Sequence, residues 1–312
     1  MIKMLEIKDV SKKFSRVAAV QNFSLQLEVG EIVGLLGPNG AGKTTVMRMA
    51  AGYLRPDRGD VTIHGYSTKT NRRRALSHLG YLPETGQVYP EMDVYSFLLF
   101  CGRAKGLRGR QLKDAIVESM ERMQLTSVAH QTIGVLSKGF ARRVGLAQAI
   151  MSNPSLILLD EPTDGLDPNQ KYRIRELLKG LSKTAAILIS THLLDDVEAI
   201  CSRTVIMARG HCILDTTPAN LRASAAANTR IHLEVVAARA EGIANILLMD
   251  QAVTGLYAEP LDDGYIRMTI IPEDGKDLLG YIGMLSHQYG WSLHALKRSS
   301  GELSEIFRKL TE

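Results

Sequence analysis

Hydrophobic and polar positions follow two different periods along this chain. Apolar runs at 32–36, 156–160 and 185–190 have the length and composition of buried β-strands, whereas Leu112 and Ile116 recur at helical spacing. Strands are predicted at 5–10, 23–27, 32–36, 60–64, 79–82, 156–160, 185–190, 203–208 and 212–214, and helices at 43–51, 141–151, 169–182 and 193–199, with a mainly helical stretch from 94 to 152. This alternation indicates an α/β fold with a mainly parallel sheet.

A second, smaller unit is predicted after residue 228. The segment 223–228 reads Ala-Ser-Ala-Ala-Ala-Asn and is interpreted as a linker between a first domain, 1–222, and a C-terminal domain, 229–312. The C-terminal pattern predicts strands at 229–236, 265–271 and 291–296, helices at 238–249 and 276–287, and room for another strand in 252–260. This order indicates a small α+β domain with a split βαβ arrangement. A closing helix is expected where Ser299 and Glu302 are spaced as a capping box.

Composition changes this picture little. The chain has 312 residues and 45% hydrophobic residues, and no run approaches the roughly 18 apolar residues that span a bilayer. The N-terminus alternates and carries Glu6, so it is interpreted as a strand and not as a signal peptide. Three widely spaced cysteines without a CxxC motif favour a reducing compartment over disulfides or zinc.

The net charge of +5 is unevenly distributed. Residues 228–312 carry 8 basic and 12 acidic residues, whereas residues 1–227 carry 30 basic and 21 acidic ones. A basic first domain suits phosphate ligands and the anionic face of a membrane. No stripe of alternating aromatic and basic residues is present in the sequence, so nucleic acid is not expected as a partner.

The most informative motif is a glycine-rich loop directly after the predicted strand 32–36. It consists of Gly37, Pro38, Asn39, Gly40, Ala41, Gly42, Lys43, Thr44 and Thr45. The glycines let successive backbone N–H groups point at one anion, and the helix that follows adds the positive end of its dipole. Lys43 is expected to reach the β- and γ-phosphates of a nucleotide, and the Thr44 hydroxyl to bind Mg²⁺. The alternative, a glycine-rich turn with a chance lysine, does not explain the strand and helix around it.

Two adjacent acids close the apolar strand 156–160. Side chains alternate along a strand, so Asp160 and Glu161 are expected to point to different places. Asp160 is predicted to bind Mg²⁺, and Glu161 to polarise the water that attacks the γ-phosphate. The alternative interpretation is a pair of solvated acids at the end of a strand.

Two further segments are candidates for phosphate contact. His192 follows the strand 185–190 and is expected to emerge beside the same phosphates, where an imidazole can bond the γ-phosphate or orient the water. Ser137 is a candidate N-cap of a helix, and Gly139 permits the close approach of an anion. Taken alone, this second segment is an ordinary helix start.

Together these motifs resemble the ATP-binding cassette (ABC) ATPases over about residues 5–222. Gly37–Thr45 is similar to Walker A, 136–140 to the signature loop, 156–161 to Walker B and 165–167 to the D-loop, with His192 as the switch histidine. The resemblance implies an α/β P-loop core with a mainly parallel sheet, an antiparallel β part and an inserted helical subdomain at about 86–152. It also implies that Phe14 stacks on adenine; the alternative is a core residue at a strand end.

The resemblance further implies a head-to-tail dimer, formed with a second copy or with another cassette. In that arrangement Ser137 and Gly139 contact the ATP of the partner chain. Glu84 stands where glutamine is usual in the Q-loop and is expected to bind Mg²⁺. Lys138 and Phe140 replace the second glycine and the glutamine of the usual signature.

The motif variants and the C-terminal extension resemble the subgroup that works with separate ABC-2-type permeases, often exporters. This implies an ATPase subunit that lies in the cytoplasm, bound to the inner face of the cell membrane through a permease. The segment 85–106 is the expected docking surface, although Val94, Phe97, Leu98 and Phe100 within it suit a core equally well. Two alternatives are a soluble ABC ATPase that acts on ribosomes or DNA, and a nucleotide-dependent regulatory module without turnover.

Overall fold

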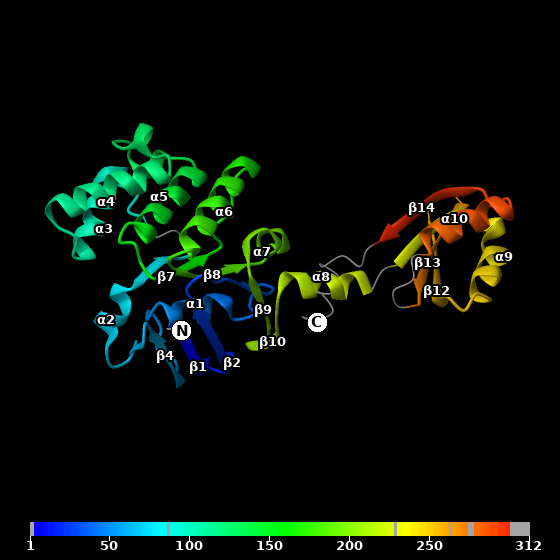
Figure 1. The fold of residues 1–312 in the computed structure, drawn as a ribbon, viewed down its shortest axis with the longest axis horizontal. Coiled ribbons are helices and arrows are strands. Elements are labelled where there is room, and N and C mark those ends of the chain that lie inside the picture. Colours follow the sequence, from blue (N-terminus) through cyan, green and yellow to red (C-terminus); the bar gives the residue numbers. More distant parts are fainter. Residues whose placement is uncertain (1–2, 86–87, 228–229, 262–263, 274–277, 300–312) are drawn as a thin grey trace. The chain divides into compact units, whose positions relative to one another are not determined.

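The computed structural model describes residues 3–85, 88–227, 230–261, 264–273 and 278–299. The chain divides into two compact units at the boundary between Pro218 and Ala219 (Figure 1). In the described part of the chain, no helix is both long and apolar enough to cross a membrane. Each unit has its own hydrophobic core, so each is described separately.

A six-stranded sheet forms the centre of the first unit, in the order β10-β9-β3-β8-β7-β6. Its strands are β3 (Ile32–Leu36), β6 (Leu79–Leu82), β7 (Leu156–Asp160), β8 (Ala186–Thr191), β9 (Arg203–Ala208) and β10 (His211–Thr216). All neighbouring pairs are parallel except the hairpin β9–β10. The mainly parallel sheet predicted from the sequence is confirmed.

Both faces of this sheet are covered. Successive residues of β7 belong alternately to two hydrophobic clusters, because side chains on a strand alternate between faces. Leu156 and Leu158 pack with residues of α1 (Lys43–Ala50) on one face. On the opposite face, Ile157 and Leu159 pack with the helical residues between 94 and 151. This double burial explains why β3, β7 and β8 are continuous apolar runs.

An antiparallel sheet lies on the α1 side, in the order β2-β1-β4-β5 (Figure 1). It consists of β1 (Lys3–Phe14), β2 (Val17–Glu28), β4 (Arg58–Ile63) and β5 (Tyr66–Ser67), with α2 (Arg72–Ser77) after it. β1 and β2 are longer than the alternating pattern predicts. They extend past three register shifts between Ile7 and Lys13, where the alternation is lost.

The helical layer lies on the other face of the six-stranded sheet (Figure 1). It contains α3 (Val94–Ala104), α4 (Gly109–Arg122), two short 3₁₀ turns (Thr126–Val128 and Ile133–Val135) and α5 (Lys138–Ile150). The remaining helices of the unit are α6 (Pro168–Ser182) and α7 (Leu194–Ile200). α5 begins three residues before the predicted start, because the Ser137 hydroxyl accepts a hydrogen bond from the Phe140 N–H and caps the helix there.

The C-terminal unit has the predicted split βαβ arrangement. Its sheet has the order β12-β13-β11-β14, with every pair antiparallel. The elements are β11 (Arg230–Val236), α9 (Ala237–Leu248), β12 (Val253–Pro260), β13 (Tyr265–Pro272), α10 (Leu279–Gln288) and β14 (Leu293–Ser299). Residues of α9 and α10 pack with alternate residues of β11 and β13 to form the core of this unit. The sequence of a strand, a helix, two strands, a helix and a strand is the ferredoxin-like topology.

Most of the predicted linker at 223–228 is helical in the structure. Residues 218–227 form α8 (Pro218–Ala227), which begins at the boundary between the two units. Alanine has the highest helix propensity, and the low-information stretch is rich in alanine, so the same composition supports a helix. Residue 228 and residues 300–312, where the closing helix is predicted, lie outside the described residues, whereas Ser299 of the predicted capping box ends β14.

Candidate functional site

Four loops converge at one edge of the six-stranded sheet. β3 leads into the glycine-rich loop, β7 ends at Asp160, β8 is followed by His192, and β6 leads to Glu84. These strands are parallel neighbours, so their carboxyl ends meet at the same edge. Residues that are more than 100 positions apart in the sequence are thereby brought together.

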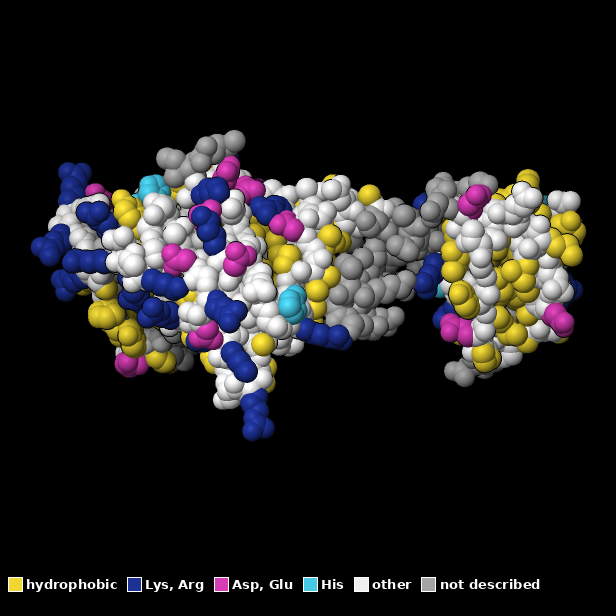
Figure 2. Space-filling view, turned by 90° about the horizontal axis from the view of Figure 1, so that it is seen from below, with side chains coloured by type: hydrophobic (Ala, Val, Ile, Leu, Met, Phe, Trp, Pro, Cys, Tyr) yellow, Lys and Arg dark blue, Asp and Glu magenta, His cyan; other side chains and the backbone are white. Residues whose placement is uncertain are grey.

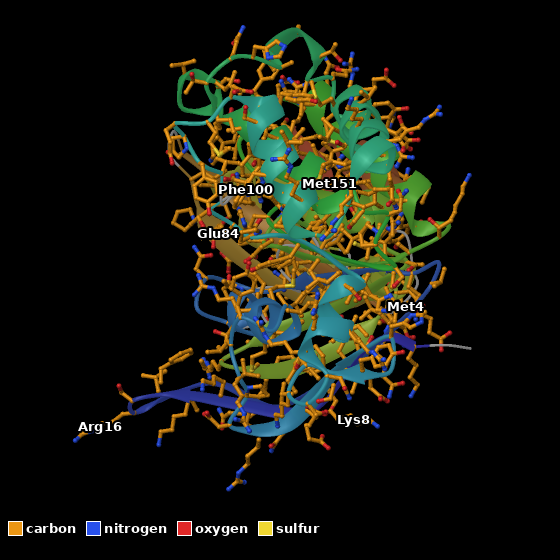
Figure 3. The ribbon with its side chains drawn as sticks, turned by 90° about the vertical axis from the view of Figure 1, so that its left-hand side faces the viewer. Met4, Lys8, Arg16, Glu84, Phe100 and Met151 are labelled. Carbon is orange, nitrogen blue, oxygen red and sulfur yellow. The ribbon has the colours of Figure 1, made fainter. Side chains whose placement is uncertain are left out.

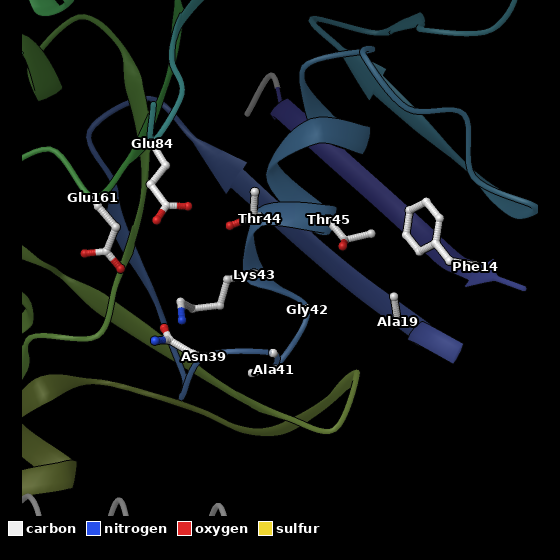
Figure 4. A pocket seen from close by; sticks show the side chains of 11 residues that line it. Phe14, Ala19, Asn39, Ala41, Gly42, Lys43, Thr44, Thr45, Glu84 and Glu161 are labelled. Carbon is white, nitrogen blue, oxygen red and sulfur yellow. The ribbon is translucent and has the colours of Figure 1, made fainter. Parts of the chain in front are cut away.

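A pocket of about 430 Å³ opens at this edge (Figure 4). Its lining consists of Phe14, Ala19, Asn39, Gly40, Ala41, Gly42, Lys43, Thr44, Thr45, Glu84 and Glu161. All of these except Ala19 are predicted site residues. Figure 4 shows the carboxylates of Glu84 and Glu161 near Lys43 and Thr44, and Phe14 at the opposite end of the pocket.

The glycine-rich loop holds the lysine side chain inside its own curve. The Lys43 ammonium group donates to the carbonyl oxygens of Gly37 at 2.6 Å and Pro38 at 3.2 Å. Burial lowers the pKa of Lys43, and the charges of Glu161, Asp160 and Glu84 oppose this shift. Gly42 has φ +105°, and a Cβ there would lie 2.5 Å from the Ala19 carbonyl oxygen, so the loop requires glycine at that position.

Asp160 has the environment of a cation ligand. Its Oδ1 accepts a hydrogen bond from the Ser190 hydroxyl, and its buried Oδ2 has no hydrogen-bond partner among the described residues. Burial raises the pKa of Asp160, the Glu84 charge raises it further, and the hydroxyls of Ser190 and Thr44 and the charge of Arg142 lower it. An unsatisfied buried oxygen beside the Thr44 hydroxyl fits Mg²⁺, which prefers oxygen ligands.

The protein alone offers this cation few ligands. Among the described residues, no cluster of three or more His, Cys, Asp or Glu side chains has the geometry of a metal site. Mg²⁺ is commonly held by one or two carboxylates together with the phosphates of a substrate. Thr44, Asp160 and Glu84 supply hydroxyl and carboxylate oxygens, the type of ligand that such a site uses.

Glu161 and His192 form a hydrogen-bonded pair. His192 Nδ1 lies 2.9 Å from Glu161 Oε1, and the Glu161 N–H donates to the Ser190 carbonyl at 3.0 Å. Burial raises the pKa of Glu161, whereas the hydrogen bond and charge of His192 and the charge of Lys43 lower it. Glu161 also has φ +52°, which is uncommon for a residue with a side chain. A carboxylate held in this way has the setting of a general base.

Phe14 is exposed at the end of β1, with 48% of its surface accessible, and the Lys12 ammonium lies 5.7 Å from its ring centroid. The interpretation of Phe14 as a core residue is therefore wrong. An exposed ring at the rim of a polar pocket is available for stacking on a planar base.

Ser137 and Gly139 do not line the pocket in this chain. Ser137 is exposed at the start of α5, where its hydroxyl accepts from the Phe140 N–H at 3.4 Å. Gly139 is buried, and a Cβ there would lie 2.7 Å from Gln170 Oε1. One chain thus brings Lys43, Asp160, Glu161 and His192 together but leaves these two residues apart.

Sequence reasoning missed Arg142, a buried arginine on α5 that binds backbone carbonyls at the ends of β6 and β7. The available signal was its position: Arg142 is four residues before Leu146 on the buried face of a helix. A charge on such a face requires partners, and the sequence alone does not show where those partners lie.

Comparisons with known proteins agree with this geometry. The family model described as ABC transporter matches residues 20–164. The uncharacterized ABC transporter ATP-binding protein YxlF of Bacillus subtilis is 41% identical over 207 residues, which make up 66% of this chain and 68% of that protein. The Nod factor export ATP-binding protein I of Rhizobium etli is 34% identical, over 70% of this chain and 69% of that protein. A solved structure of the ATP binding subunit of an ABC transporter has a TM-score of 0.66 and 29% identity, covering 71% of this chain and 92% of the other.

The fold and the pocket define the class of protein, a P-loop ATPase built on an ABC cassette. The chain belongs to the family of ABC transporter ATP-binding proteins. It is the ATP-binding subunit of an ABC transporter and hydrolyses ATP.

Proposed function

We propose that two copies of this chain, facing head to tail, bind and hydrolyse MgATP at their interface to drive a separate ABC-2-type membrane permease, an exporter. The observation that carries this proposal is the division of the site. The phosphate loop, Glu84 and Glu161 line one pocket, whereas Ser137 and Gly139 lie outside it. A second chain that supplies these two residues completes the contacts to the γ-phosphate.

The residues of the pocket take complementary roles in this proposal. The loop amides and Lys43 bind the phosphates, and Phe14 stacks on the adenine ring. Thr44, Asp160 and Glu84 hold Mg²⁺, which neutralises charge on the β- and γ-phosphates when bound. Glu161 accepts a proton from the attacking water, and His192 orients its carboxylate through the 2.9 Å contact.

A groove of about 550 Å³ is the proposed docking site for the permease. It is lined by Tyr53, Tyr81, Pro83, Val88, Tyr89, Phe97, Phe100, Cys101 and Gln148. Tyr53, Tyr89 and Phe100 are large exposed hydrophobic side chains, so the groove suits an apolar segment of a partner. Figure 3 labels Phe100 and Glu84 on the same side of the unit, and Pro83 of the groove directly precedes Glu84. Docking there is therefore adjacent to the nucleotide pocket.

This groove refines the interpretation of the segment 85–106. Val94, Phe97 and Leu98 are buried in the helical layer and belong to the core, whereas Phe100 is exposed. The export direction is supported by a relative whose name gives it as an export protein. A location at the inner face of the cell membrane follows from binding to the permease.

The dimer is tested by blocking hydrolysis and measuring mass. Glu161→Gln with ATP is expected to form a stable dimer, because the intact γ-phosphate links both chains. Adding Ser137→Arg is expected to abolish that dimer in light scattering after gel filtration. Adding Ser127→Arg, at another exposed serine of the helical layer, is expected to leave it intact. A dimer that persists with Ser137→Arg would contradict the proposed interface.

The docking groove is tested by membrane association in the source cells. Phe100→Glu is expected to move the full-length chain from the membrane pellet to the supernatant. Val117→Glu, at a similarly exposed hydrophobic position on α4, is the matched control and is expected to stay in the pellet. Equal release of both variants, or of neither, would contradict this docking surface.

A further inference from the structure

Arg142 is a buried cation that the proposed mechanism does not yet use. It lies in the second turn of α5 and is only 7% exposed. One terminal nitrogen, Nη1, donates to the carbonyl oxygens of Pro83 at 3.1 Å and Glu84 at 2.8 Å. The other, Nη2, donates to the carbonyl oxygens of Asp160 and Glu161. A single guanidinium thus joins the loops that follow β6 and β7.

These four carbonyls belong to the backbone that carries the pocket's acids. Glu84 and Glu161 line the pocket, and Asp160 has the orphaned Oδ2. A carbonyl that is fixed in direction restricts the peptide unit after it, and so restricts where the side chains can point. The planar, rigid fork of arginine can bind two loops at once, whereas a lysine ammonium is a point donor on a flexible stem.

The backbone of Glu161 needs such support. Its φ of +52° is sparsely populated by residues other than glycine, and such a conformation persists only where the surroundings impose it. The Ser190 carbonyl accepts the Glu161 N–H at 3.0 Å, and Arg142 binds the Glu161 carbonyl from the other side. Both ends of the residue are therefore held.

Arg142 also supplies charge. Its cationic form is opposed by burial and favoured by Asp160, Asp164, Glu161 and Glu84. Among the described residues, other cationic groups near these acids are Lys43, Lys138 at 2.8 Å from Asp164 and, when protonated, His192. Glu84 occupies the Q-loop position where a neutral glutamine is usual, so the pocket holds one additional negative charge. The charge of Arg142 offsets it.

We propose that Arg142 is a positioning residue for the hydrolysis reaction: from helix α5 it orients Glu161 and Glu84 through their backbone and offsets the charge of Glu84. This inference rests on the roles proposed above for Glu161 and Glu84. Arg142 itself is not among the residues that line the pocket. The effect of removing it is therefore expected in turnover and not in nucleotide binding.

The next residue provides a matched control. Arg143 is also a partly buried arginine on α5, and it also donates to two carbonyls, of Met123 at 3.1 Å and Gln124 at 3.4 Å. Its guanidinium lies 4.1 Å from the Phe140 ring centroid. Neither of its carbonyl partners lies at the nucleotide pocket. If replacing Arg142 and replacing Arg143 lower kcat equally, the loss is therefore due to a structural change in α5 and not to a specific role of Arg142.

The test compares steady-state hydrolysis and equilibrium nucleotide binding in the full-length chain. Arg142→Gln is expected to lower kcat by roughly tenfold to a hundredfold, the range found when groups that orient a ligating side chain are removed. ATP affinity is expected to stay within about threefold, a change below 1 kcal/mol by the relation between affinity and free energy. Arg143→Gln is expected to keep the wild-type kcat.

Two further variants separate charge and orientation from folding. Arg142→Lys keeps the positive charge but loses the planar pair of donor nitrogens, and its kcat is expected to lie between those of wild type and Arg142→Gln. If Arg142→Gln does not fold, Arg142→Lys replaces it in the test. Introducing Glu84→Gln together with Arg142→Gln is expected to cost less than the product of the two single effects, because the charge to be offset is gone.

Each remaining outcome overturns a specific statement. Wild-type kcat in Arg142→Gln, or an equal loss in Arg143→Gln, would overturn the positioning role, as would a loss in affinity as large as the loss in kcat. Wild-type kcat in Arg142→Lys would show that the fork is not needed. Glu161→Gln, measured in parallel, tests the proposed base itself: wild-type hydrolysis there would refute that assignment whatever the Arg142 variants show.

Discussion

The two units arrange the strands of their sheets in different ways. In the first unit, β6, β7, β8 and β3 are parallel, so the polar residues that follow them converge at one edge. In the C-terminal unit every pair of hydrogen-bonded neighbours is antiparallel, so neighbouring strands of the sheet end at opposite edges. Its polar side chains lie along a sheet face instead. The comparison shows that strand direction, more than residue type, determines where polar side chains from several strands can meet to form a site.

The polar side chains on the sheet of the C-terminal unit pair with one another. Arg267 lies between Glu234, at 2.9 Å, and Glu259, at 3.2 Å. His232 Nδ1 lies 3.0 Å from the Thr269 hydroxyl oxygen. These cross-strand pairs stabilise the sheet, whereas Asp160 in the first unit keeps an oxygen without a partner.

The surfaces differ as well. Residues 1–227 carry 30 basic and 21 acidic residues, and residues 228–312 carry 8 and 12. Figure 2 shows many Lys and Arg side chains on the visible face of the first unit, and mainly hydrophobic and uncharged surface on that of the second. Met249, Tyr257 and Met284 are among the exposed hydrophobic residues of the second unit. A basic surface suits phosphate ligands, and this difference agrees with the placement of the pocket.

The largest expected effect tests whether chemistry is confined to the first unit. Glu161→Gln is expected to lower the rate of ATP hydrolysis by about 10²- to 10⁴-fold, the usual contribution of a general base. Glu259→Gln, in the C-terminal unit, is the matched change and is expected to leave the rate unchanged. A phosphate-release assay at saturating MgATP measures both. A comparable loss of hydrolysis rate in both variants would contradict the conclusion that the chemistry is confined to the first unit.

The second test addresses the separate cores. Leu233 is fully buried in the core of the C-terminal unit, so Leu233→Ala is expected to destabilise that unit by about 3 kcal/mol. ATP hydrolysis is expected to be unaffected at temperatures below the unfolding of this unit. Leu248→Ala, at an exposed position of the same unit, is the control and is expected to cost far less. Calorimetry and the hydrolysis assay check this; a parallel loss of activity would mean that the units depend on each other.

The third test concerns a partly buried lysine in the first unit, outside the pocket. Burial lowers the pKa of Lys105, at the end of α3, to about 8 from its usual 10.5. Below pH 8 the lysine is charged in both the folded and unfolded states, and the folded state bears the cost of burial. Between pH 8 and 10.5 the unfolded state binds more protons, so the wild-type free energy of unfolding is expected to gain from this group as pH rises.

Lys105→Met removes this cost. It is expected to raise the free energy of unfolding at pH 7 by about 2 kcal/mol, with an advantage over wild type that shrinks above pH 8. Denaturant unfolding at pH 7 and pH 10 measures it. Lys113→Met, at an exposed lysine of α4, is the control and is expected to show no such pH dependence. An advantage that grows with pH would contradict the assigned direction.

The smallest effect is expected on the polar face of the C-terminal sheet. Arg267→Met breaks one exposed ion pair, with Glu259, and one partly buried pair, with Glu234; both contribute little because water and salt screen them. The midpoint of thermal unfolding of that unit is expected to fall only slightly, and less at high salt, while hydrolysis is unchanged. A shift as large as that of Leu233→Ala would show that this face has a structural role comparable to the core.

Much of the site was readable from the sequence because its motifs are contiguous. The run from Gly37 to Thr45 carries its own strand, turn and helix, and the pair Asp160–Glu161 ends a continuous apolar strand. The split βαβ order of the C-terminal unit was also predictable, since strand and helix periods differ. The helical conformation of the alanine-rich stretch in α8 was not predicted, because composition alone does not distinguish an irregular segment from a helix.

The sequence by itself determined the local elements, the phosphate loop and the chemical types that line the pocket, because short-range periodicity and adjacent residues specify them. Only the tertiary structure decided that Phe14 is exposed at the pocket rim, that Phe97 is core whereas Phe100 is surface, and that Arg142 binds the loops after β6 and β7. Those relations join residues far apart in the chain. They depend on strand order and helix packing, which no local pattern encodes.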